Sequence, residues 1–278
     1  MKREAILDFF IFNGRTLGMD ENAVFDQLES LSIYEVIRLV NGIPLFLEEH
    51  LSRMRCSAEL LGYELKKTDQ TILEEIVCLS KMNQCENMNI KLLCTDFDQL
   101  EQSFLVYFVE SYYPLEEVYH RGIATTLYKS ERENPNAKTM NIDLREGVNR
   151  AIKEAGGFEV LLVNKDGCVT EGSRSNIFFV KEGKVYTAPS EKVLKGVTRM
   201  KIMSICKNLN IPVIEKAVNE DSMEDMDGAF ITGTSIGVLP ITSIGELLLK
   251  SVNNIVIKRI SDGYKENVKS YLRECMLS

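Results

Sequence analysis

Four short segments of the chain carry residues that could do chemistry, and two of these segments place a reactive side chain in a turn. Lys138 lies in NPNAKTMN, where a proline and two asparagines predict a turn before a helix. Its amine could act as a nucleophile, although the position alone is typical of a solvated loop lysine. Glu171 lies in VTEGSRSNIFFV, in a predicted turn that leads into an apolar strand. Taken alone, such a glutamate is most often an ordinary turn residue.

The other two segments offer groups that bind anions. In VLKGVTRMKIM, Gly196 precedes a predicted helix, so the amides of Val197 and Thr198 are first-turn donors at the positive end of the helix dipole. A phosphate fits such a helix start, although most helix starts bind only water. In FITGTSIGVLP, a strand ends at Gly233 and Thr234, where amides and hydroxyls form a second group of donors.

The elements that must position these residues form two α/β successions. The first has strands at 4–12, 32–40, 89–95 and 103–110, and helices at 47–62 and 70–83. The second has helices at 144–156, after residue 196 and at 252–275, with strands at 158–163, 175–181, 184–187, 211–215, 228–232 and 238–242. A polar stretch separates the two. We therefore expect a small N-terminal α/β domain at 1–113, an interdomain linker at 114–120 and a large C-terminal α/β domain at 121–278.

Composition limits the classes of function. The chain has 278 residues, of which 45% are apolar and 27% charged, and a net charge of -8, which argues against a nucleic-acid partner. No apolar run reaches the roughly 18–20 residues that span a bilayer, so no membrane partner is expected. Seven scattered cysteines without a C-x-x-C pair indicate reduced thiols and a cytoplasmic location. The two histidines, His50 and His120, have no partner at ligand spacing, so we expect no metal site.

Taken together in this order, the four segments resemble the class IV aminotransferases, the fold-type-IV family of pyridoxal-phosphate enzymes. The family signature runs from E-x-small-x-x-N-apolar-Phe through an apolar-x-Thr strand end to apolar-x-Gly-apolar-x-Arg. The chain meets it at Glu171, Ser173, Asn176, Ile177, Phe178, Val185, Thr187, Leu194, Gly196, Val197 and Arg199. YEVIRLVNGIPLFLEEHLSRMRCSAELL, at 34–61, resembles the family's strand, turn and first helix, and NPNAKTMN resembles its catalytic-lysine segment. The resemblance is closest to the D-amino acid aminotransferases, through YEVIR and TEGSRSNIF.

The resemblance implies a fold class and a set of roles. It implies an α/β (α+β) fold of type IV, with two α/β domains and the cofactor pyridoxal 5'-phosphate at the domain interface. Lys138 would form the Schiff base and move the substrate proton, and Glu171 would keep the pyridine nitrogen protonated. Tyr34 and Arg38 share a strand face and would lie toward the substrate. The other implied cofactor-binding residues are Arg53, whose guanidinium would bind the phosphate, Ser175, Asn176, Leu194, Gly196, Val197, Thr198, Gly233 and Thr234.

Three family markers are missing, so the amino acid and its enantiomer are not predicted. ENAVFDQLESLS replaces D-R-G-x-x-x-G-D, KLLCTDFDQLEQ lacks the Arg-x-His of D-amino acid enzymes, and no tyrosine follows Lys138 as in branched-chain enzymes. The favoured function is an aminotransferase that moves an amino group between an amino acid and a 2-oxo acid. The alternatives are an aminodeoxychorismate lyase that releases pyruvate and a catalytically degenerate structural paralogue. The resemblance also implies a homodimer.

Overall fold

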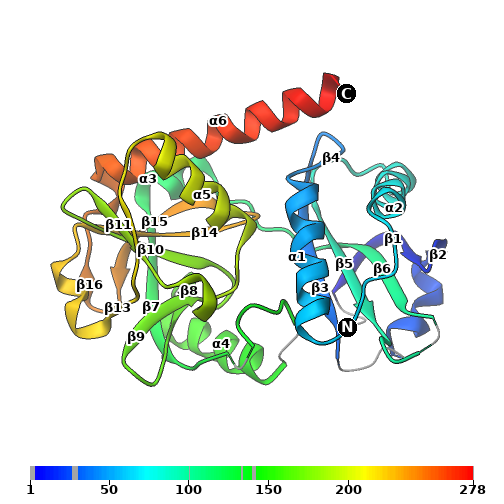
Figure 1. Ribbon diagram of the computed structural model, residues 1–278, viewed down its shortest axis with the longest axis horizontal. Helices are drawn as coiled ribbons and strands as arrows, with labels where there is room; N and C mark the ends of the chain where they lie inside the picture. The colour runs from blue at the N-terminus through cyan, green and yellow to red at the C-terminus, as the bar shows by residue number, and fades with distance from the viewer. Residues whose placement is uncertain (1–3, 27–30, 100, 133, 140–141, 278) are drawn as a thin grey trace. The chain divides into compact units, whose positions relative to one another are not determined.

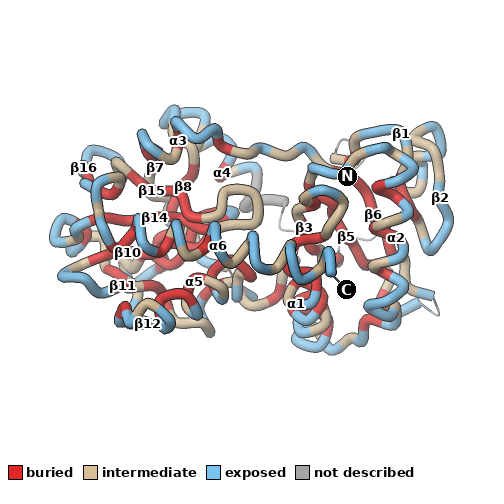
Figure 2. Tube along the Cα trace, turned by 90° about the horizontal axis from the view of Figure 1, so that it is seen from above, coloured by how far each residue is buried: buried red, intermediate tan, exposed pale blue. Residues whose placement is uncertain are grey.

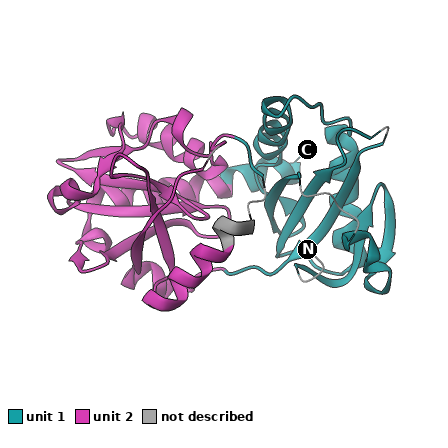
Figure 3. Ribbon diagram, turned by 90° about the horizontal axis from the view of Figure 1, so that it is seen from below, with its two compact units in different colours: residues 1–112, 137–140, 270–278 teal, residues 113–136, 141–269 magenta. Residues whose placement is uncertain are grey.

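The computed structural model describes residues 4–26, 31–99, 101–132, 134–139 and 142–277, and for 142–145 only the backbone. The chain divides into two compact units (Figure 3). Unit 1 contains residues 1–112, 137–140 and 270–278, and unit 2 contains residues 113–136 and 141–269. The segment with Lys138 therefore belongs to the first unit, although the chain on both sides of it belongs to the second. The expected domains were continuous stretches of the chain. They therefore did not assign residues 137–140 and 270–278 to the first unit.

Unit 1 is built on one antiparallel six-stranded sheet with the order β2-β1-β6-β5-β3-β4 (Figure 1). Its elements are β1 (Ala5–Phe12), β2 (Arg15–Gly18), the short helix η1 (Met19–Asp26), β3 (Ile33–Val40), β4 (Ile43–Pro44), α1 (Leu47–Leu60), α2 (Asp69–Met82), β5 (Asn89–Thr95) and β6 (Ser103–Val109). These bounds confirm the predicted strands and helices of the first succession to within two residues. The strands β2 and β4 and the helix η1 were not predicted.

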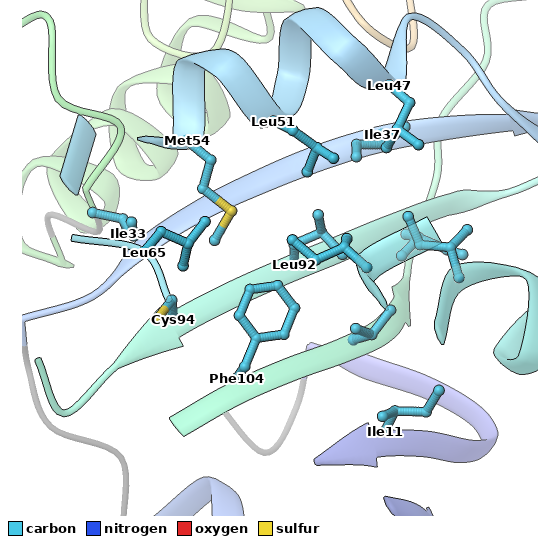
Figure 4. Close-up of a cluster of buried hydrophobic side chains, with 14 of the residues drawn as sticks. Ile11, Ile33, Ile37, Leu47, Leu51, Met54, Leu65, Leu92, Cys94 and Phe104 are labelled. Atoms are coloured by element: carbon cyan, nitrogen blue, oxygen red, sulfur yellow. The ribbon is translucent and has the colours of Figure 1, made fainter. Parts of the chain in front are cut away.

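The two faces of this sheet carry different apolar clusters. On one face, Leu51 and Met54 of α1 pack with Ile37 and Leu92 of the sheet (Figure 4). On the other, which we call the Tyr34 face, Tyr34 packs against a cluster of Ala5, Phe10, Phe25, Leu93, Leu105 and Tyr107. Since side chains alternate along a strand, β3 directs Glu35 toward α1 and its neighbour Tyr34 to the opposite face.

Unit 2 is built on a mixed ten-stranded sheet with the order β12-β11-β10-β14-β15-β7-β8-β9-β13, and β16 pairs with β15. Its strands are β7 (Ile123–Lys129), β8 (Glu159–Val163), β9 (Cys168–Gly172), β10 (Asn176–Lys181), β11 (Lys184–Thr187), β12 (Val213–Glu215), β13 (Val218–Asn219), β14 (Gly228–Gly233), β15 (Gly237–Ile244) and β16 (Leu247–Leu248). Its helices are α3 (Glu116–Arg121), α4 (Ile142–Ala155), η2 (Ser190–Lys192), α5 (Val197–Asn208), η3 (Glu220–Asp225), η4 (Ser251–Asn253) and α6 (Ile255–Leu277), whose last residues are counted in unit 1. Figure 2 shows continuous burial along β10 and β14, as expected for central strands.

Two sequence expectations differ from the structure in this unit. The stretch at 114–120, expected as a linker, contains most of α3, and the buried Val118 and the half-buried Tyr119 pack into the core of unit 2. Glu171 was expected in a turn, but it is a residue of β9, and the chain turns only after Gly172. The two residues left between the predicted strands at 175–181 and 184–187, Glu182 and Gly183, form a two-residue hairpin turn with φ of 50° and 74°. In the described part of the chain, no helix is long and apolar enough to cross a membrane.

Candidate active site

Lys138 is anchored by its backbone to β3 and α1 of unit 1. Its carbonyl accepts a hydrogen bond from the amide of Tyr34 at 3.1 Å, and its amide donates to Oγ of Ser57 at 3.2 Å. The next residue, Thr139, forms an isolated antiparallel bridge with Ile33. The side chain is half-buried, with Nζ 4.7 Å from the centroid of the Tyr34 ring. Lys138 is therefore a fixed residue beside Tyr34 rather than a solvated loop lysine.

Arg53, the expected phosphate arginine, is part of a buried ionic cluster on α1. Its Nε donates to Oε1 of Glu35 at 2.7 Å and its Nη2 to Oε2 at 2.5 Å, so the pair is bidentate. Nδ1 of His50 lies 2.8 Å from the same Oε2. Sequence reasoning missed the contacts of Glu35 with Arg53 and with His50. A guanidinium has five N–H donors, so the pair with Glu35 orients Arg53 without exhausting its capacity for a phosphate.

The cluster sets the ionisation of its acid and its histidine. Burial raises the pKa of Glu35, but the charge of Arg53 and the hydrogen bonds from His50 and Arg53 outweigh it and bring the pKa to about 2. Burial lowers the pKa of His50 despite its contact with Glu35. The folded protein therefore holds an ionised Glu35 and disfavours protonation of His50. The contribution of each group to stability is complete above its unfolded-state pKa and is lost as the pH falls toward its lowered folded-state pKa.

We expect Glu35→Gln to lower the free energy of unfolding at pH 7 by roughly 3 kcal/mol, because Arg53 is left with an uncompensated buried charge. The folded pKa of Glu35 is depressed, so its contribution is present above pH 4.5 and is lost as the pH falls toward 2. Urea denaturation from pH 7 to pH 3 measures the difference between wild type and variant, which should shrink as the pH falls. The exposed Glu59→Gln on the same helix is the control. A constant difference across the range would contradict the assignment.

Glu171 is held in unit 2 by a cation and a backbone amide. The residue is 3% exposed, and Oε1 of its carboxylate lies 2.9 Å from Nε of Arg132 in an ion pair. Its Oε2 accepts a hydrogen bond from the amide of Leu194 at 3.2 Å. Arg132 also donates from Nη2 to the carbonyl of Ser173 at 2.6 Å. Arg132 was not predicted from the sequence, because it lies about 40 residues from its partners, in an unremarkable polar stretch.

A second buried carboxylate, Glu159 of β8, organises the turn after Glu171. It accepts hydrogen bonds from the hydroxyls of Ser173 at 2.5 Å and Ser175 at 3.0 Å, and from the amide of Arg174 at 3.3 Å. The predicted site residue Ser175 therefore directs its hydroxyl to Glu159. Together with the Gly172 amide, which donates to the Ser175 carbonyl, these bonds fix the chain directly after Glu171.

The start of α5 is the candidate phosphate site of unit 2. Gly196 is its N-cap, Val197 and Thr198 are buried in its first turn, and the first amides of a helix have no partner within that helix. Asn176 of β10 donates from Nδ2 to the carbonyl of Leu194 at 2.9 Å. A Cβ on Gly196 would lie 2.1 Å from Oδ1 of Asn176. The close approach explains why a glycine stands before this helix.

We expect Gly196→Ala to weaken cofactor binding by roughly tenfold or more and to lower the free energy of unfolding by about 1–3 kcal/mol. The added methyl group must displace Asn176 and break its hydrogen bond to Leu194. Equilibrium dialysis of pyridoxal phosphate and urea denaturation measure the two effects. Gly157→Ala is the matched control, because a Cβ there meets nothing closer than 3.4 Å. Wild-type affinity in Gly196→Ala would contradict a role for this helix start.

The remaining predicted residues lie at the end of β14, in the loop before α5 and on the Tyr34 face. Gly233 ends β14 and Thr234 begins the loop to β15, with both half-buried. Leu194, also half-buried, is the residue that joins Asn176 to Glu171 through its carbonyl and its amide. Arg38 is half-buried in β3, opposite Asn89. Unit 1 thus holds Tyr34, Arg38, Arg53 and Lys138, and unit 2 holds Glu171 and the other predicted residues.

The comparison with protein families identifies the chain. The family model "Amino-transferase class IV" matches residues 32–244, and the chain belongs to this family. It is 29% identical over 260 residues to D-alanine aminotransferase from Bacillus licheniformis, with 84% of this chain and 87% of that protein covered. It is also 29% identical over 257 residues to a probable branched-chain-amino-acid aminotransferase from Rickettsia conorii, with 87% of each covered.

A solved structure of the branched-chain amino acid aminotransferase from Thermobaculum terrenum, in its holo form with pyridoxal phosphate, has the same fold. The TM-score is 0.82 at 22% identity, with 96% of this chain and 95% of that chain covered. The predictions of a fold-type-IV α/β architecture and of a pyridoxal-phosphate-dependent class IV aminotransferase are thereby confirmed at the level of family and fold.

Proposed function

We propose that this chain binds pyridoxal 5'-phosphate covalently through the amine of Lys138 and transfers an amino group between an amino acid and a 2-oxo acid. The observation that carries the proposal is the anchoring of Lys138 by Tyr34 and Ser57, which fixes an amine next to an aromatic side chain. A flexible surface lysine would need no such anchoring. Family membership supports the class of reaction.

The residues of the two units fit the chemical groups of this cofactor. The aldehyde requires an amine, which Lys138 offers. The pyridine nitrogen requires a buried carboxylate, and Glu171 is buried and oriented by Arg132 and Leu194. The phosphate requires a cation and several amides, which Arg53 and the first turn of α5 offer. Unit 1 would therefore supply the amine and the guanidinium, and unit 2 the carboxylate and the amides of the helix start.

The proposed roles follow from the contacts of each residue. When bound, the cofactor withdraws the electrons of the bond broken at the substrate α-carbon. The Lys138 amine would act as the base that takes up and returns the α-proton of the substrate. Glu171 would hold a proton on the pyridine nitrogen, and Glu159, through Ser173 and Ser175, fixes the chain beside Glu171. In unit 2, Leu194 would contact the ring, and Gly196, Val197, Thr198, Gly233 and Thr234 would offer donors to the phosphate, while Asn176 holds the Leu194 loop. In unit 1, Arg53 would offer its guanidinium to the phosphate.

Steady-state kinetics with two substrates tests the reaction class. Initial rates of the holoenzyme should give parallel double-reciprocal lines when an amino donor and a 2-oxo acid are varied, because the first product leaves before the second substrate binds. A panel of L- and D-donors defines the amino acid. Pyruvate release from aminodeoxychorismate without any acceptor would instead identify a lyase, and bound cofactor with no turnover of either kind would identify a degenerate paralogue.

We also propose that the enzyme is a homodimer, as its resemblance to the family implies, and that it is cytoplasmic, as its scattered cysteines indicate. Its small-molecule partners are then an amino acid and a 2-oxo acid. Light scattering coupled to gel filtration should give twice the chain mass of 31.6 kDa. A mass equal to one chain at micromolar concentration would contradict the dimer.

A further inference from the structure

We propose that Arg199 is a positioning residue for the reaction. It fixes the loop of residues 188–196, which we call the η2 loop, and this loop in turn holds Glu171 and the segment before Lys138. The inference rests on the proposed function, because it concerns residues that act with Lys138 and Glu171. Arg199 is the last residue of the signature in the sequence, but the proposed function leaves it without a role.

Arg199 occupies a position that disfavours a cation unless its charge has a use. It is the third residue of α5, and the first turn of a helix lies at the positive end of the dipole, where anions are favoured. The residue is nevertheless only 3% exposed. A guanidinium buried at the start of a helix requires partners outside that helix.

The guanidinium of Arg199 binds the beginning of the η2 loop. Its Nη2 donates to the carbonyl of Ala188 and to Oε2 of Glu215, both at 2.9 Å, and its Nη1 donates to Oγ of Ser190 at 3.1 Å. Ser190 donates to the same Oε2 of Glu215, from its amide at 3.1 Å and from its hydroxyl at 2.7 Å. These bonds tie the loop to α5 and to the end of β12.

The contacts of Arg199 with the loop matter more than its ion pair. The side chain of Glu215 is 42% exposed, against 3% for Arg199, so solvent screens the attraction between their charges. The hydrogen bonds from Ser190 and Arg199 lower the pKa of Glu215, so the carboxylate is ionised at neutral pH. A glutamine in its place would still offer an oxygen to the same donors.

The far end of the η2 loop holds Glu171. The amide of Leu194 donates to Oε2 of Glu171, and the carbonyl of Leu194 accepts from Nδ2 of Asn176. Only the rest of η2 and the buried Val193 separate Ser190 from Leu194. A displacement of Ser190 is therefore transmitted over a short path to the amide that orients Glu171.

The middle of the η2 loop holds the segment before Lys138. Nδ2 of Asn136 donates to the carbonyl of Glu191 at 2.9 Å, and Asn136 lies two residues before Lys138 in the chain. The loop is thus hydrogen-bonded both to Glu171 and to the chain that leads to Lys138. Because Arg199 fixes this loop, it acts on both residues without touching either.

Unit 1 supplies a matched control for the loss of an arginine that binds a loop. Arg55 of α1 donates to the carbonyls of Leu65 and Lys67, both at 2.8 Å, and forms an ion pair with the exposed Asp69. It holds the loop between α1 and α2 by the same kinds of contact. None of the residues predicted for the site lies in that loop, so Arg55→Met removes similar bonds from a place that should not affect the reaction.

The test compares Arg199→Met, Arg199→Lys, Glu215→Gln and Arg55→Met in the holoenzyme. Arg199→Met should lower kcat by about 10–100-fold with KM within about threefold of wild type, because Glu171 loses its fixed amide donor. Arg199→Lys should retain more activity than Arg199→Met, since an ammonium can still donate to the loop. Glu215→Gln should stay within about threefold of wild type. Arg55→Met should leave kcat unchanged.

A spectrophotometric pH titration of the bound cofactor gives a readout besides turnover. A proton held by Glu171 on the pyridine nitrogen repels a second proton on the nitrogen of Lys138. In Arg199→Met the first proton is held less firmly, so the midpoint of the titration should move to higher pH. Arg55→Met should keep the wild-type midpoint.

Two results would overturn the inference. One is a folded Arg199→Met with the kcat and the titration midpoint of wild type, which would leave Arg199 a stabilising role alone. The other is an equal loss of kcat in Arg55→Met. If Arg199→Met does not fold, Ser190→Ala decides, because it removes one partner of Arg199 at a half-buried position. It should lower kcat by about three- to tenfold and raise the midpoint, and wild-type values of both would refute the inference.

Borohydride fixation of the cofactor on Lys138 keeps this test separate from the proposed function. A wild-type protein that fixes no cofactor contradicts the proposed function itself. A wild-type protein that fixes the cofactor on Lys138, together with variants of Arg199 and Ser190 that behave as wild type, refutes only the role of Arg199.

Discussion

Lys138→Ala should lower kcat for transamination by roughly ten-thousand-fold or more, because it removes both the covalent link to the cofactor and the base that moves the α-proton. The fold should persist, since Lys138 is anchored through its backbone amide and carbonyl, which alanine retains. Single-turnover and steady-state assays with the best amino donor measure the loss. Far-ultraviolet circular dichroism and urea denaturation show whether the variant is folded.

A control variant and a rescue experiment show whether the loss of activity is specific to the Lys138 amine. Lys184→Ala removes an exposed lysine from β11 and should retain wild-type kcat. Small primary amines added to Lys138→Ala should restore part of the activity, since an exogenous base can enter the space of the missing side chain. Retention of more than a tenth of wild-type kcat by Lys138→Ala would show that another group performs the chemistry.

Glu171→Gln should lower kcat by about 10²–10³-fold while the cofactor stays bound. The amide keeps the shape of the side chain and can still accept from Leu194, but it carries no charge to hold a proton on the pyridine nitrogen. It also leaves Arg132 without its carboxylate. The absorption spectrum of the bound cofactor reports the protonation change independently of turnover.

The exposed Glu154→Gln of α4 is the control for loss of one carboxylate, and it should have no effect on kcat or on the spectrum. A merely structural role for Glu171 predicts a different outcome. In that case Glu171→Gln would release the cofactor or unfold, and any protein that kept its cofactor would keep its spectrum and its kcat.

Much of the fold could be predicted because it depends on local patterns. The helix after Gly196 and the hairpin at Glu182 and Gly183 follow from a cap and from a turn that needs positive φ. The strand β3 follows from its alternation. The short helix α3 was missed because its six residues are mostly exposed, and only Val118 is buried. The sequence of α3 therefore carries almost no helical pattern of apolar residues.

The candidate site was predictable only where its residues lie in contiguous motifs. Glu171, Asn176, Leu194 and Gly196 stand in the family signature, and the structure joins them through Leu194. Arg132 and Glu159 act on this group from distant parts of the chain, and no local pattern connects them. Long-range pairing of this kind is decided by the fold, which brings β8, β9 and the segment before α4 together.

Glu35 is different, because a signal for it existed. It lies on the buried face of β3 between Ile33 and Ile37, where a carboxylate requires a cation. His50 and Arg53, three residues apart on the helix that packs on this face, were the available partners.

Borohydride reduction of the holoenzyme, followed by mass-spectrometric peptide mapping, tests the central claim most directly. The account predicts that the protein binds pyridoxal phosphate, absorbs in the visible range and, after reduction, carries the phosphopyridoxyl group on Lys138 alone. A protein that takes up no pyridoxal phosphate, or one whose label lies on a different lysine, would contradict it.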